Sequence, residues 1–319
     1  MRLTAGELRR RSQRLQRRLA TCDLCPRRCG VDRGAGERGF CGVGTAAPVA
    51  AAVAHFGEEP PISGTRGAGT IFFAGCNLRC CYCQNRQISR WTGARTSPAR
   101  IRELTAPELA AEMLRLQEAG CHNIELVTPS HVVPQIVAAL ALAAEEGLDL
   151  PVVYNSGGYD TVDVLRELEG VIDVFLPDLK YSDSETAEQL SAAADYWAVA
   201  RAAVGEMVRQ AGALELDAAG IARRGVIVRH LALPEDLAGS REVLSFLAGL
   251  DPAPAVALMA QFYPIAECDH SQLQRAITTQ EWAAVVAELE ALDLTGWTQA
   301  PSVNRSYRPD FSRADPFVG

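Results

Sequence analysis

Residues 69–85 read GTIFFAGCNLRCCYCQN. The first half of this stretch, residues 71–74, is a short apolar run bracketed by glycines, which predicts a buried strand. The second half holds four cysteines within eight residues, and Cys76, Cys80 and Cys83 have the spacing C-x3-C-x2-C. Three thiolates on one tight loop can hold three irons of a cubane iron–sulfur cluster. The fourth iron is then left open, and an open metal position is where a substrate or cofactor can bind.

Two other interpretations of this loop are a structural zinc knuckle and a loose group of buried thiols. Structural zinc sites usually show paired C-x2-C units, which this spacing does not provide. Cys81 is the fourth cysteine of the loop, and we expect it to point away from the other three and to be a bystander.

Composition limits the classes of protein that fit. The chain has 319 residues, of which 48% are hydrophobic and 22% charged, and one large domain with a small module is expected. A net charge of −8 argues against binding to nucleic acid, and we find no apolar run of membrane-spanning length. The first residues are rich in arginine and lack the apolar core of a secretory signal. Ten cysteines without an export signal favour a cytoplasmic location and metal binding rather than disulfides.

A second group of cysteines lies near the N-terminus. Cys22, Cys25, Cys29 and Cys41 are spaced C-x2-C-x3-C-x11-C. Four thiolates without a nearby histidine suit an all-cysteine zinc site or a second, fully ligated iron–sulfur cluster. The alternative is that the four thiols bind no metal. We therefore predict a metal-binding leader over residues 1–60 and a catalytic core over residues 61–319.

The rest of the chain alternates apolar runs with helical patterns, which predicts parallel βαβ units in an α/β fold. Six units are too few for a closed eight-stranded barrel, and periodicity alone also fits a doubly wound sheet. In both architectures the functional groups gather at the carboxyl ends of the strands. The predicted strands are residues 71–74, 124–127, 152–155, 174–176, 226–231 and 256–263.

Polar residues fall at these strand ends. Asn155 follows the third predicted strand, Asp178 and Lys180 follow the fourth, and Arg229 lies on the fifth. Lys180 is the only lysine in a chain that otherwise uses arginine. An ammonium and a planar guanidinium suit a ligand that carries a carboxylate, so we predict that this group binds a cofactor. Ion pairs with no further role are the alternative.

The cysteine loop resembles the C-x3-C-x-aromatic-C signature of the radical S-adenosylmethionine (SAM) enzymes, with Tyr82 as the aromatic residue. The resemblance implies a partial, open (β/α)6 barrel and a 4Fe–4S cluster on Cys76, Cys80 and Cys83. It also implies that SAM binds the open iron through its amino and carboxylate groups. An electron from the cluster then cleaves SAM to methionine and a 5′-deoxyadenosyl radical.

Over nearly its whole length, the chain is similar to a pyruvate formate-lyase activating enzyme-like subgroup with a cysteine-rich leader. The stretch HFGEEPPISG at residues 55–64 contributes to this resemblance. The segments DLK at 178–180 and VR at 228–229 match segments whose lysine and arginine help to bind SAM in that group. Residues 127–131, VTPSH, depart from the family's G-G-E segment.

The subgroup implies an electron donor such as flavodoxin or ferredoxin and a glycyl-radical enzyme as the protein substrate. A radical SAM enzyme that modifies another peptide or a small molecule is the first alternative. A non-catalytic Fe–S protein is the second, although electron transfer requires fully ligated clusters and the three-cysteine loop argues against it.

Overall fold

The computed structural model describes residues 3–93, 99–299 and 309–317. Its centre is a curved sheet with the strand order β10-β9-β8-β6-β5-β4-β2-β1-β3, and β7 pairs with β8 beside this path. The path has two ends, β10 and β3, so the sheet is open within the described residues. The strands are β1 (Ala47–His55), β2 (Ala68–Phe73), β3 (Arg102–Leu104), β4 (Ile124–Val127), β5 (Val152–Ser156), β6 (Val174–Pro177), β7 (Glu215–Leu216), β8 (Ala222–Leu231), β9 (Ala255–Met259) and β10 (Gly296–Thr298).

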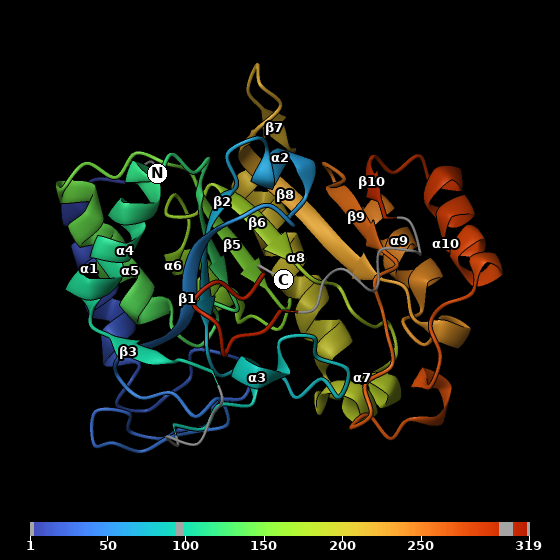
Figure 1. Cartoon of the computed structure of the whole chain (residues 1–319), viewed down its shortest axis with the longest axis horizontal. Helices are drawn as coiled ribbons and strands as arrows, with labels where there is room; N and C mark the ends of the chain where they lie inside the picture. The colour runs from blue at the N-terminus through green and yellow to red at the C-terminus, as the bar shows by residue number, and fades with distance from the viewer. Residues whose placement is uncertain (1–2, 94–98, 300–308, 318–319) are drawn as a thin grey trace.

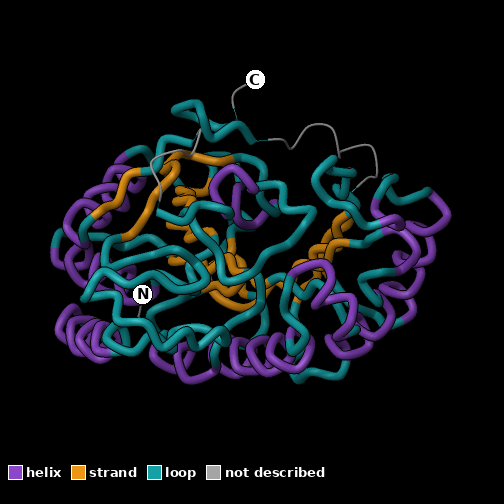
Figure 2. Tube along the Cα trace, turned by 90° about the horizontal axis from the view of Figure 1, so that it is seen from below, coloured by secondary structure: helices purple, strands orange, loops and turns teal. Residues whose placement is uncertain are grey.

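Helices cover the outer face of this sheet, and the strands lie inside (Figures 1 and 2). This is the open α/β barrel that the sequence predicts, and all six predicted strands are present as β2, β4, β5, β6, β8 and β9. The helices are α1 (Ala5–Arg17), α2 (Pro60–Ser63), α3 (Arg86–Ser89), α4 (Ala106–Glu118), α5 (Val133–Glu145), α6 (Val162–Glu167), α7 (Ser184–Ser191), α8 (Tyr196–Ala211), α9 (Ser240–Ala248) and α10 (Thr279–Ala291).

The strands from β2 to β10 along the path pair in parallel. The burial of their side chains is typical of a parallel sheet. Every residue of β2 and β4 is buried, as expected when helices cover one face and packed side chains fill the other. Phe175 on β6 is fully buried and packs edge-on against Tyr154 on β5. Because all these strands run the same way, the loops that follow them meet at one end of the barrel.

Residues 47–55 were not predicted as a strand, yet they form β1, which pairs antiparallel with β2. The segment APVAAAVAH contains five alanines, which have low strand propensity, so its sequence signal is weak. Pairing with the buried β2 decides its conformation. β1 lies within the segment 1–60 and joins this segment directly to the sheet of the core.

Local signals fix several helix ends. Thr105 and Glu108 form a capping box at the start of α4, where the Thr105 backbone N–H donates to Glu108 Oε2 at 2.8 Å. Thr278 and Glu281 form the same arrangement at the start of α10. Within the described residues, no helix is long and apolar enough to cross a membrane.

The C-terminal residues 309–317 pack against β1 and β2 (Figures 1 and 2). Phe311 is fully buried, and its ring lies 5.4 Å from that of Phe72 on β2. The ring of Phe317 lies 3.9 Å from the ring of His55 at the end of β1. These aromatic contacts fix residues 309–317 to β1 and β2 beside the cavity, which Pro309 and Phe317 line.

Candidate functional site

A cavity of about 470 Å³ lies inside the barrel and extends to the carboxyl ends of the strands. Its size is in the range of small-molecule and cofactor sites. All seven residues predicted for the cluster and the cofactor line this one cavity, although they come from four separate regions of the chain. They are Cys76, Cys80, Cys83, Asn155, Asp178, Lys180 and Arg229.

The cysteine loop leaves β2 through Gly75, which has a φ of +79°. A Cβ atom at this position would lie 2.5 Å from the carbonyl oxygen of Cys41, so glycine lets the leader pack directly against the loop. The three cysteine sulfurs each accept one hydrogen bond. Leu78 N–H donates to Cys76 at 3.3 Å, Ser191 Oγ to Cys80 at 3.0 Å and Ser89 Oγ to Cys83 at 3.3 Å.

The environment of these thiols suits metal ligation. Burial, together with the neighbouring Cys80, raises the pKa of Cys76 to about 12. Such a thiol gives up its proton when a cation replaces it, and a metal cluster supplies that cation. Three thiols that share a loop, face one cavity and accept hydrogen bonds therefore fit three irons of a 4Fe–4S cluster.

Among the described residues, no group of three or more His, Cys, Asp or Glu side chains is arranged to hold a metal ion. This finding concerns ligands that converge on one ion. In a cubane cluster each thiolate binds a different iron, so the three cysteines need not converge on a point.

Cys81 differs from the prediction in one respect. It does point away from the cavity, but it forms a disulfide with Cys268, 187 residues further along the chain. The expectation of a bystander thiol, and of cysteines without disulfides, is therefore wrong at this position. The bond ties the cysteine loop to the segment that follows β9. Sequence spacing gave no indication of the partner, because the contact depends on the fold of the intervening residues.

Asp178 and Lys180 follow β6 and are paired with each other at the cavity wall. Burial opposes the charge of Lys180, but the carboxylate of Asp178 outweighs it and raises the pKa of the ammonium well above its usual value. Gly158, with a φ of +73°, lets the loop after β5 approach closely, since a Cβ there would lie 2.1 Å from the Asp178 carbonyl oxygen. Lys180 is therefore a charged donor held in a fixed place.

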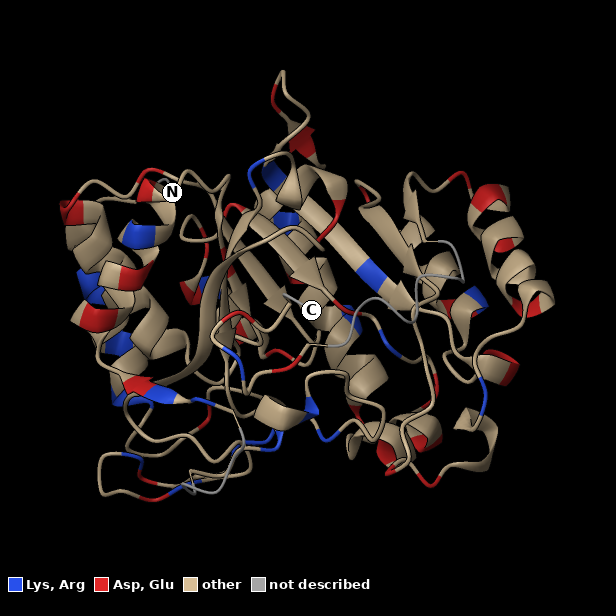
Figure 3. Ribbon diagram, viewed as in Figure 1, with Lys and Arg blue, Asp and Glu red and all other residues tan. Residues whose placement is uncertain are grey.

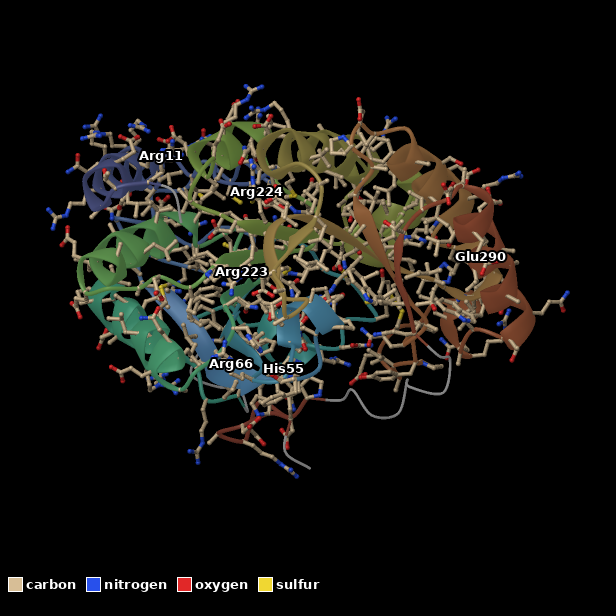
Figure 4. The ribbon with its side chains drawn as sticks, turned by 90° about the horizontal axis from the view of Figure 1, so that it is seen from above. Arg11, His55, Arg66, Arg223, Arg224 and Glu290 are labelled. Atoms are coloured by element: carbon tan, nitrogen blue, oxygen red, sulfur yellow. A yellow bond between two sulfur atoms is a disulfide. The ribbon has the colours of Figure 1, made fainter. Side chains whose placement is uncertain are left out.

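Arg229 on β8 is bound to two carboxylates from the segment between β1 and α2. Its Nε donates to Glu59 Oε1 at 2.7 Å and its Nη2 to Glu59 Oε2 at 2.6 Å, and Nη2 also pairs with Glu58. Burial opposes the charge of Arg229, but Glu59 and Glu58 outweigh it and raise its pKa. The guanidinium is thus already hydrogen-bonded to carboxylates of this protein. Figure 4 labels His55, the last residue of β1, which directly precedes the segment that carries Glu58 and Glu59.

Asn155 at the end of β5 donates to Glu125 Oε1 at 2.7 Å, and Thr70 Oγ1 donates to the other oxygen of Glu125 at 2.8 Å. Burial raises the pKa of Glu125 well above its usual value. These hydrogen bonds fix the orientation of the Asn155 amide. Asn155 lines the same cavity as Asp178 and Lys180.

The leader packs onto the cysteine loop through arginines. The ring of Phe40 lies between the guanidinium groups of Arg27 and Arg79, at 4.0 and 4.3 Å from its centroid. Arg27 Nε also donates to the Asn77 carbonyl at 2.8 Å. Figure 3 shows basic residues on the side of the molecule that carries these loops. Among the leader thiols, burial, together with nearby Cys41, Cys22 and Cys29, raises the pKa of Cys25 to about 12.

Sequence reasoning missed several residues of the site. Glu58 and Glu59 were part of a quoted motif but had no assigned role, and Ser89, Ser191 and Cys268 had no signal at all. Serine is common in loops and at helix ends, so only the folded chain shows which hydroxyl reaches a sulfur.

Comparisons with known proteins identify the family of this chain. Residues 70–212 match the model of the radical SAM superfamily. An uncharacterised protein of Methanocaldococcus jannaschii is 30% identical over 278 residues, which make up 86% of this chain and 76% of that protein. The chain belongs to the radical SAM superfamily. Membership implies a 4Fe–4S cluster and SAM as cofactors, and it makes the protein a radical SAM enzyme.

Two solved structures are similar to this chain at low sequence identity. The FeFe-hydrogenase maturase HydG from Carboxydothermus hydrogenoformans is 16% identical with a TM-score of 0.50, covering 72% of this chain and 53% of that chain. A radical SAM methyltransferase from Sphaerobacter thermophilus is 17% identical with a TM-score of 0.48, covering 78% of this chain and 69% of that chain. At this identity the likeness to HydG supports the fold alone.

Replacing Cys80 by Ala should abolish cluster binding and reductive SAM cleavage, because one iron loses its only protein ligand. Cys81→Ala is the matched control, since Cys81 faces Cys268 rather than the cavity, and it should keep most of both. Iron per chain and 5′-deoxyadenosine formed under strict anaerobiosis measure the two effects. Full SAM cleavage by Cys80→Ala would contradict the assignment.

Proposed function

We propose that this protein is a glycyl-radical activating enzyme of the pyruvate formate-lyase type. When bound, the cluster and SAM supply the chemistry: one electron cleaves SAM to methionine and a 5′-deoxyadenosyl radical, which takes a hydrogen atom from a backbone glycine of the partner. The observation that carries the proposal is the juxtaposition of the three-cysteine loop with the DLK and VR segments around one cavity. These segments are the ones shared with that group of activating enzymes.

The chain's own residues have two tasks in this reaction. Cys76, Cys80 and Cys83 line the cavity, where they would hold three irons of the cluster and leave the fourth iron without a protein ligand. The surrounding barrel then positions the cofactor and keeps water away from a reactive species. A flavodoxin or ferredoxin is the proposed source of the electron.

The substrate is tested with a full-length pyruvate formate-lyase-type enzyme whose glycines carry deuterium at the α carbon. We expect a glycyl radical by electron paramagnetic resonance (EPR) and transfer of deuterium into 5′-deoxyadenosine. The Cys83→Ala variant is the control and should give neither signal. Formation of 5′-deoxyadenosine without deuterium and without a glycyl radical would reject this substrate while leaving the superfamily assignment in place.

We also propose that Lys180, Arg229, Asp178 and Asn155 form the SAM-binding wall, with Lys180 and Arg229 contacting the SAM carboxylate. The fixed Lys180 ammonium supports this directly. Arg229 is already paired with Glu58 and Glu59, so its contact with SAM would require sharing or exchanging those carboxylates. Lys180 is therefore the stronger candidate of the two.

Lys180→Arg is the sharper test of this wall, because it keeps the positive charge but replaces a compact ammonium by a wide, planar guanidinium. Loss of one charge-assisted hydrogen bond should weaken SAM binding about 10- to 150-fold. Equilibrium binding of SAM to the reconstituted protein measures the change, and Lys180→Ala provides the comparison. Parent-like affinity in both variants would reduce Lys180 to a structural role.

Finally, we propose that Cys22, Cys25, Cys29 and Cys41 hold a second metal centre that stabilises the leader. The mutual effect of these thiols on their pKa values supports their proximity. Four cysteine thiolates suit either an all-cysteine zinc site or a fully ligated iron–sulfur cluster. Zinc or iron retained by the Cys76/Cys80/Cys83 triple alanine variant is the expected result, and a metal-free triple variant would reject the centre.

A further inference from the structure

The C-terminal end of α7 forms the support on which the cysteine loop rests. The last carbonyl groups of a helix have no partner within the helix and must find one elsewhere. In α7 the Leu190 carbonyl accepts a hydrogen bond from Cys81 N–H at 2.8 Å, and the Ser191 carbonyl accepts one from Arg79 N–H at 3.1 Å. The helix end and the loop therefore satisfy each other's backbone groups. This fixes Cys80, which lies between Arg79 and Cys81, relative to Ser191.

The side chain of Ser191 makes a further contact with the same loop. Its Oγ donates to Cys80 Sγ at 3.0 Å, the shortest of the three hydrogen bonds to Cys76, Cys80 and Cys83. Behind it, Tyr181 Oη lies 2.8 Å from Ser191 Oγ, and Tyr82 Oη is hydrogen-bonded to Tyr181 Oη. Ser191 and Tyr181 are fully buried and Tyr82 nearly so, which shields this row of hydroxyls from water.

The chemistry of the sulfur decides the direction of these hydrogen bonds. A thiolate bound to iron has no proton and can only accept. Each hydroxyl has one proton to donate, so when Ser191 donates to Cys80, Tyr181 must donate to Ser191 and Tyr82 to Tyr181. The three O–H groups then point toward the sulfur in sequence, and each strengthens the next.

We propose that Ser191, oriented by Tyr181 and Tyr82, is a positioning residue that stabilises the reduced cluster through Cys80 and so raises its reduction potential. One-electron reduction adds negative charge, part of which lies on the cysteine sulfurs. A donor aimed at a sulfur stabilises the more negative state more, and hydrogen bonds to sulfur are a known determinant of cluster potentials. The proposal rests on the 4Fe–4S cluster of the superfamily and is independent of whether the substrate is a glycyl-radical enzyme.

The test compares Ser191→Ala with Ser184→Ala, which alters an exposed serine at the other end of α7. Both variants are reconstituted as full chains, and cluster reduction is followed by EPR during a redox titration without SAM. We expect Ser191→Ala to shift the reduction equilibrium about tenfold toward the oxidised cluster, or about 59 mV lower. Ser184→Ala should match the parent, and so should Ser191→Thr, which keeps the hydroxyl.

Tyr181→Phe gives a second measurement that leaves Ser191 in place. It should lower the potential in the same direction by less than Ser191→Ala, since it removes only the hydroxyl that orients Ser191. This variant, together with Ser191→Thr, carries the test if Ser191→Ala does not fold or load iron. The proposal would be overturned if Ser191→Ala had the same reduction potential as the parent. If Ser191→Ala does not bind the cluster, an unchanged potential in Tyr181→Phe would overturn it instead. So would an equal shift in Ser191→Ala and Ser191→Thr, which would indicate packing rather than hydrogen bonding.

Discussion

The structure depends on holding three thiols at one wall of a buried cavity while leaving room beside them. A buried thiol without a metal keeps its proton, so the loop alone does not define a charged site. Its geometry comes from its surroundings: Gly75 lets the leader pack against it, and the end of α7 binds its backbone on the other side. Three donors then reach the sulfurs from Leu78, Ser89 and Ser191.

The parallel sheet explains why distant residues meet this loop. β2 delivers the cysteines, β5 and β6 deliver Asn155 and the Asp178–Lys180 pair, and β8 delivers Arg229. Because these strands run in one direction, their following loops share one end of the barrel. The antiparallel β1 has a different role, since it is followed directly by the segment whose Glu58 and Glu59 carboxylates pair with Arg229. Residues 309–317 pack against β1 and β2 through Phe311 and Phe317.

The sequence was sufficient where local pattern determines structure. The spacing of Cys76, Cys80 and Cys83 and the apolar strand before them predicted the loop. The strand–helix alternation predicted parallel βαβ units, and the resemblance to radical SAM enzymes implied the open barrel. Lys180 stood out because it is the only lysine. The sequence was not sufficient where tertiary contacts determine the structure. β1 has a weak local signal. Cys268 contacts Cys81 from 187 positions away, and Ser191 contacts Cys80 from 111 positions away.

The central claim is that one iron of a three-cysteine cluster is open and binds SAM. The most direct measurement is the EPR spectrum of the reduced, reconstituted protein before and after SAM is added. The account predicts that SAM changes the spectrum, because its amino and carboxylate groups become ligands of the open iron. A cluster spectrum that stays the same at saturating SAM would contradict the claim.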